Sequence, residues 1–153
     1  MNMKKIIRMI LVLTIAMAAT LAVAAPESKK PPQNVPPFPG TLVNARFVYV
    51  TSYDGDQFDP DLLPDDRQAI GAVQDAIQKW GKFTVVYKVE EADIVLAVMS
   101  RPTEDILALY DASSWRHGGQ YLWRMTGRNG LQPSETPLLT NLKKAFESVP
   151  ASK

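Results

Sequence analysis

A continuous apolar run at residues 94–99, Ile-Val-Leu-Ala-Val-Met, limits the possible folds of this chain more than any other feature. A polar break at residues 90–93 precedes the run, and Ser100-Arg101-Pro102 ends it. A strand with one face in water alternates apolar and polar residues, whereas a strand buried on both faces is apolar throughout. The run therefore predicts a central strand that other parts of the chain cover on both faces.

Four further segments have the β-branched and aromatic composition of strands, and they are residues 43–51, 83–89, 106–110 and 120–126. A loop that contains Gly118 and Gly119 joins the last two segments. We therefore expect these two strands to pair antiparallel through a mobile connection.

Two segments have the apolar spacing of amphipathic helices. The first has Asp65 as its expected N-cap, with Gln68 at capping-box spacing, and it closes near Gly81. Its apolar face repeats at intervals of three and four residues and consists of Ile70, Val73, Ile77 and Trp80. Because Trp80 lies on this face, the sequence predicts that Trp80→Ala costs about 3 to 5 kcal/mol of stability.

The second helix is expected to have Thr136 as its cap and Pro137 as its first residue. Its apolar face consists of Leu138, Leu142, Ala145, Phe146 and Val149. The order of elements is then β-α-β-β-β-β-α. The expected fold class is α+β, a two-layer sandwich in which residues 41–150 form one domain, with two amphipathic helices on a mixed sheet of about four to five strands.

The N-terminal residues 1–24 have the pattern of a signal peptide. Lys4, Lys5 and Arg8 form a basic leader, an apolar stretch follows, and Ala22-Val23-Ala24 matches the small-x-small pattern of signal peptidase sites. Cleavage after residue 24 predicts a periplasmic or secreted protein that meets the membrane only through its signal. The alternative is an uncleaved anchor over residues 9–25, which is at the lower limit of spanning length. The absence of cysteine excludes a lipoprotein anchor.

Residues 25–40 form an expected linker with prolines at 26, 31, 32, 36, 37 and 39. This density favours extended polyproline II and a semi-rigid spacer, and the alternative is a docking motif for a proline-binding partner.

The charge balance argues against nucleic acid as a partner. Cleavage removes three of the 17 basic residues and none of the 16 acidic residues, so the mature net charge is −2. An exported protein without cysteine must also depend on a hydrophobic core, because it has no disulfides.

The motifs of residues 78–86 (QKWGKFTVV) and 91–96 (EADIVL), with Tyr110-Asp111 and Leu122-Trp123 after them, show a resemblance to known proteins. In these motifs the chain resembles exported bacterial domains related to the N-terminal domain of TolB and to CsgG-type envelope proteins. The resemblance covers residues 43–126 and implies a role in the cell envelope through protein contacts. It implies no catalytic residues, and this chain lacks the TolB propeller.

The acidic loop at residues 54–61 has alternating carboxylates, which are ligands that calcium accepts. An EF-hand loop that began at Asp54 would have Phe58, Asp59 and Asp65 at its fifth, sixth and twelfth positions, where an oxygen ligand, glycine and glutamate belong. The pattern favours carboxylates that stabilise turns, with a weak cation site as the alternative.

The single histidine, His117, lies near Ser113, Ser114 and Asp111 in one expected loop. The segment lacks the strand-to-helix turn that exposes a nucleophilic serine, and one histidine supplies at most one metal ligand of its type. We therefore expect a solvated loop histidine and assign no catalytic, metal or cofactor-binding residue.

An expected interaction edge combines aromatic residues with arginines, and its members are Trp115, Arg116, Tyr121, Trp123, Arg124 and Arg128. Tryptophan and arginine are favoured anchors of protein interfaces. Strand alternation predicts that Tyr121, Trp123 and Met125 share one face. Ordinary core packing of these aromatic residues is the alternative.

Two functions agree with these observations. The first is an exported, non-catalytic binding or accessory module with a protein partner in the cell envelope. The second is a small exported hydrolase that uses carboxylates, either Asp93 or Asp111 at a strand end, or a group in which Glu104, Asp105 and Asp111 approach one another. A concave pocket with at least two converging ionisable groups of shifted pKa would favour the enzyme.

Overall fold

The computed structural model describes residues 34–150. The expected signal peptide and the expected linker up to residue 33 lie outside this range. No helix within the described residues is long and apolar enough to cross a membrane.

Five strands form one mixed sheet, which confirms the expected α+β fold class. They are β1 (Phe47–Ser52), β2 (Thr84–Val86), β3 (Ile94–Ser100), β4 (Asp105–Asp111) and β5 (Trp123–Gly127). Their order across the sheet is β2-β1-β3-β4-β5, with β1 parallel to β2 and β3. The pairs β3–β4 and β4–β5 are antiparallel, as expected for the latter pair. The apolar run is thus the central strand.

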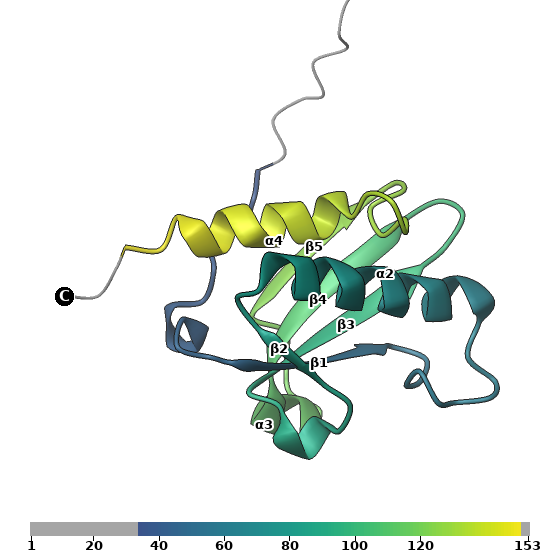
Figure 1. Ribbon diagram of the computed structural model, residues 1–153, viewed down its shortest axis with the longest axis horizontal. Helices are drawn as coiled ribbons and strands as arrows, with labels where there is room; N and C mark the ends of the chain where they lie inside the picture. Colours follow the sequence, from purple (N-terminus) through teal and green to yellow (C-terminus); the bar gives the residue numbers. More distant parts are fainter. Residues whose placement is uncertain (1–33, 151–153) are drawn as a thin grey trace, which may run out of the picture. The chain divides into compact units, whose positions relative to one another are not determined.

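Helices α2 (Pro64–Trp80) and α4 (Pro137–Glu147) lie side by side over one face of the sheet (Figure 1). The main core fills the space between this face and the helices. It takes alternate residues of β3, Ile94, Leu96 and Val98, because successive side chains of a strand point to opposite faces.

The opposite face of the sheet holds a second, smaller core. Tyr49, Val95, Ala97, Ala108 and Tyr110 form its strand layer, and Ala112 completes the buried set. The short helix α3 (Ala112–Arg116) and the 3-10 turn η2 (Val89–Glu91) provide part of its cover through Trp115 and Val89. The central strand is therefore buried on both faces, as its composition predicts.

The start of α2 differs from the expected capping box. The helix begins at Pro64, and Leu63 occupies the N-cap position without a side-chain hydrogen bond. Proline suits the first helical position because its φ is already helical and its missing N–H has no partner to lose there. The helix ends as expected, since Gly81 is left-handed with φ 71° and donates its N–H to the Ile77 carbonyl.

The connection between β4 and β5 was expected to be a loop, but it begins with helix α3. The Asp111 carboxylate accepts the backbone N–H groups of Ser113 and Ser114, so it supplies the cap that a short helix needs. Residues 43–46 precede β1 rather than belonging to it, and the 3-10 turn η1 (Gly40–Leu42) comes before them.

The described part of the expected linker, residues 34–40, packs on the domain. Phe38 is buried and its ring meets that of Phe146 edge to face, with centroids 5.0 Å apart. The indole N–H of Trp123 donates to the Pro36 carbonyl at 2.9 Å. These seven residues are therefore part of the folded unit and not a free spacer.

Trp80 packs against the core but is only partly buried. Its ring meets those of Phe83 and Phe146 edge to face, at 5.3 Å and 5.6 Å between centroids. Because part of the indole is already accessible to water, we expect Trp80→Ala to cost about 2 to 3 kcal/mol, less than the sequence suggests. Urea unfolding measures this cost. The exposed neighbour Lys79→Ala is the control, and an equal effect of the two substitutions would contradict the packing role.

Candidate functional site

The sheet face opposite α2 and α4 carries no long helix within the described residues, and α3 lies at one end of it (Figure 1). Side chains from four segments meet on this face. They are Tyr53 after β1, Tyr110 at the end of β4, Trp115 in α3 and Tyr121 before β5. We call these four residues the aromatic cluster.

Tyr110 is the centre of the aromatic cluster. Its ring meets Trp115 at 4.7 Å and Tyr121 at 6.4 Å between centroids, both edge to face. Its hydroxyl donates to the Tyr53 hydroxyl at 3.2 Å. Edge-to-face pairs hold aromatic rings in defined orientations, so the cluster is an organised surface rather than a set of separate side chains.

The outer members of the aromatic cluster are accessible. Tyr53 is 39% exposed and Tyr121 is 50% exposed, while Tyr110 beneath them is buried. Partial burial raises the pKa of Tyr53 above the ordinary tyrosine value. Tyr53 is therefore a neutral phenol at neutral pH.

Arg124 lies beside the aromatic cluster, with its guanidinium carbon 5.9 Å from the centroid of the Tyr121 ring. This distance is within the range of a cation–π contact. Strand alternation in β5 sends Arg124 to the open face and its neighbours Trp123 and Met125 into the core.

The structure brings together three members of the expected interaction edge, Trp115, Tyr121 and Arg124. Trp123 is not at this surface, because it is 1% exposed and belongs to the main core. Tyr121 was expected on the same face as Trp123 but does not lie there. It precedes β5 and does not follow the alternation of that strand. Arg116 and Arg128 are both exposed, in α3 and in the turn after β5.

Tyr53 and Tyr110 belong to the aromatic cluster but were not among the expected site residues. Both follow the period-two pattern of a strand. Tyr53 is four residues after Tyr49 and Tyr110 is two residues after Ala108, so each lies on the same face as the earlier residue of its pair. That signal places them on the same face as Arg124 only when the strand pairing is known.

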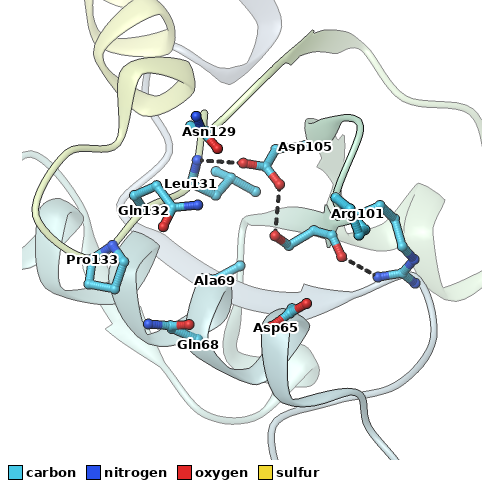
Figure 2. Close-up of a pocket in the computed structure, with 11 residues that line it drawn as sticks. Asp65, Gln68, Ala69, Arg101, Asp105, Asn129, Leu131, Gln132 and Pro133 are labelled. Carbon is cyan, nitrogen blue, oxygen red and sulfur yellow. Dashed lines mark hydrogen bonds between the residues drawn. The ribbon is translucent and has the colours of Figure 1, made fainter.

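A polar pocket of about 160 Å³ lies at the other end of the sheet, beside the carboxyl end of β3. Figure 2 shows that α2, the start of β4 and the turn at residues 129–133 enclose it. Asp105 is buried at its wall and accepts hydrogen bonds from the Ser100 hydroxyl at 2.7 Å and the Leu131 N–H at 3.1 Å. Both carboxylate oxygens of Asp105 are therefore used within the fold.

Asp66 lies behind this pocket and is 0% exposed. It accepts from the Ser52 hydroxyl at 3.0 Å, the Ser100 N–H at 2.7 Å and the Arg101 guanidinium at 2.8 Å. Arg101 also pairs with Asp54, and its hydrogen bond to Asp66 raises the Arg101 pKa. The network joins the ends of β1 and β3 to the first turn of α2.

The expected approach of Glu104, Asp105 and Asp111 is wrong. Asp105 and Asp111 are at opposite ends of β4, which separates them by about 20 Å at the usual rise per residue. The topology, with one extended strand between them, prevents any convergence.

Asp93 and Asp111 do line one shallow groove, together with Arg116. Asp93 accepts the backbone N–H groups of Arg46 and Phe47 at 2.8 Å and 3.0 Å. The Ser113 hydroxyl, and then the Ser114 N–H, hold the pKa of Asp111 below its usual value. With a lowered pKa, Asp111 is ionised at neutral pH and carries no proton to donate, so it is not suited to act as a general acid.

The acidic loop has local partners for its carboxylates. Asp56 accepts the Phe58 N–H at 2.8 Å, and Asp59 accepts the Asp61 N–H at 2.9 Å. These contacts stabilise turns, as favoured from the sequence. Within residues 34–150, no group of three or more histidine, cysteine, aspartate or glutamate residues could hold a metal ion.

His117 is exposed, and its Nδ1 lies 2.7 Å from the Ser113 carbonyl oxygen. The Ser113 hydroxyl donates to Asp111 rather than to the imidazole. The histidine therefore stabilises the end of α3 and does not activate the neighbouring serine.

Comparison of the chain with protein-family models, curated proteins and solved structures found no match.

Proposed function

We propose that this chain is an exported, non-catalytic binding module of the cell envelope, and that its contact surface is the aromatic cluster with Arg124. The observation that carries the proposal is the meeting of four aromatic side chains on a sheet face that no long helix covers within residues 34–150. Tyrosine, tryptophan and arginine together supply much of the binding energy of protein interfaces.

A surface of tyrosine and tryptophan side chains binds a partner at a low cost in entropy. Tyrosine and tryptophan provide large contact areas with few rotatable bonds, so they lose little entropy on binding. Here Tyr110 already orients Trp115 and Tyr121, which lowers the ordering cost further. Export and an envelope setting come from the N-terminal pattern and from the resemblance described above.

The alternative is a small exported hydrolase, and the observation that favours it is the polar pocket. Asp65, Arg101 and Asp105 line this pocket from three different segments. Against it, the oxygens of Asp105 are both engaged by Ser100 and Leu131. The binding surface is the better supported of the two functions.

Site-specific photo-crosslinking in cells tests the binding function. A benzoylphenylalanine at position 121 is expected to capture one defined envelope protein, because this position is half exposed and lies between the buried Tyr110 and Arg124. The same group at the exposed position Gln78 on α2 is the control and should not capture that protein.

Capture of no partner from position 121, together with a hydrolytic activity that Asp105→Asn removes from a folded protein, would overturn the binding function. Equal capture from both positions would show that the contact does not involve the aromatic cluster.

A further inference from the structure

We propose that the partner segment at the aromatic cluster is acidic, with carboxylates that contact Arg124 and the phenol hydroxyls while its apolar side chains pack on the exposed rings. This inference rests on the proposed binding function and adds the chemistry of the partner.

Arg124 has no charged partner among the described residues. The other guanidinium groups with structural roles are engaged, since Arg101 pairs with Asp54 and Asp66, and Arg67 donates to the carbonyls of Gln57 and Asp59. Arg124 is therefore available to a partner, and a guanidinium matches a carboxylate in both charge and geometry.

Charges of opposite sign act on different parts of the open face. The Arg124 cation acts on Tyr53 and lies beside the ring of Tyr121. The anions Asp56 and Glu90 act on Tyr49, within β1. The positive charge of Arg124 therefore lies beside the aromatic cluster, and charge complementarity places the acidic part of a partner over this guanidinium.

The aromatic cluster offers hydrogen-bond donors to an occupant. The Tyr53 and Tyr110 hydroxyls share one hydrogen bond, so one of their two protons remains available to an occupant. The Tyr121 hydroxyl and the Trp115 indole N–H make no hydrogen bond within residues 34–150, and an indole N–H can only donate. A carboxylate accepts only, so its chemistry fits this set of donors.

Two large apolar side chains at this surface are exposed. Tyr121 and Leu122 are consecutive and are 50% and 46% exposed. These exposed apolar groups would be buried by an occupant with apolar side chains of its own, which a small anion does not have. A neutral glycan could stack on the rings, but it has no carboxylate for the guanidinium. An acidic protein segment satisfies both requirements.

Peptide binding to the purified chain of residues 25–153 tests the inference. The probe is a short fluorescent peptide that alternates aspartate and glutamate with leucine and tyrosine, and its matched partner has asparagine and glutamine in place of the acids. We expect the acidic peptide to bind at least about tenfold more tightly, with affinity that falls as salt rises. Fluorescence anisotropy at low and high salt gives both values.

Variants locate the contact. Arg124→Glu is expected to remove the preference for the acidic peptide over the neutral peptide. Arg124→Lys should retain about half or less of this preference, because lysine lacks the planar guanidinium that binds a carboxylate through two hydrogen bonds. The control is Lys79→Glu, the same charge reversal at an exposed position on α2, which should change the affinity less than about twofold. Circular dichroism verifies that each variant is folded.

Equal binding of the two peptides, or an acidic preference that survives Arg124→Glu, would overturn the acidic assignment. Binding of chitotetraose, lost in Tyr121→Ala, with no binding of either peptide would identify a glycan surface instead. If crosslinking from position 121 captures a partner and Arg124→Glu leaves the capture unchanged, the binding function stands and only the acidic chemistry fails.

Discussion

Replacement of Asp66 by alanine is expected to lower the free energy of unfolding by about 3 kcal/mol, because it removes a buried carboxylate that accepts three hydrogen bonds, one of them from a charged group. The carboxylate is fully buried and accepts from Ser52, Ser100 and Arg101. Without it, the Ser100 N–H loses this partner, and the partly exposed Arg101 guanidinium keeps its pair with Asp54. The loss is about a third of the stability of a typical domain.

Urea unfolding of the purified chain measures this effect, and Asp65→Ala is the matched control. Asp65 is one residue earlier in the same helical turn but is exposed. Its loss removes only the favourable interaction with the helix dipole, which is below about 1 kcal/mol. Similar values for the two variants would contradict the role of Asp66 as the centre of the network.

Trp123→Ala should also cost about 3 to 5 kcal/mol, as expected for truncation of a buried tryptophan. The indole belongs to the main core, is 1% exposed and donates to the Pro36 carbonyl. The substitution therefore leaves a cavity and also removes the hydrogen bond to Pro36, one of the contacts that hold residues 34–40 on the domain. Thermal and urea unfolding give the loss of stability, and proteolysis near residue 36 should become faster.

Two further variants separate the contributions of Trp123. Trp123→Phe keeps most of the apolar volume but lacks the N–H, so it should cost about 1 to 2 kcal/mol. Trp115→Ala, at a partly exposed ring of the aromatic cluster, should cost less than Trp123→Ala and should weaken partner binding instead. A larger destabilisation at Trp115 than at Trp123 would contradict the assignment of one ring to the surface and the other to the core.

Local patterns predict most of the fold because they report which side chains must leave water. The apolar run of β3 indicates burial on both faces, and Gly81 indicates the end of α2, since glycine adopts the left-handed conformation at low cost. Pro137 likewise indicates the first residue of α4. These features depend on neighbours in the sequence and need no knowledge of the tertiary structure.

Polar residues are less predictable because their partners are distant in the sequence. The pattern around Asp65 suggests a cap, yet Asp66 makes the important contacts, with Ser100 and Arg101 more than thirty residues away. Asp111 is the reverse case, since it caps α3 locally, in a segment where no helix is expected. A five-residue helix has too short an apolar period to be recognised from its sequence.

At the candidate site, local patterns predict that aromatic residues and arginines interleave around β5, and that Arg124 and Trp123 point to opposite faces, because strand alternation is a local property. Which of the two faces is the core depends on tertiary packing. The fold packs α4 over Trp123, leaves Arg124 exposed, and brings Tyr53 from the end of β1 to Tyr110 at the end of β4. The order of the strands depends on the free energy of the whole sheet, so no segment of the sequence contains it.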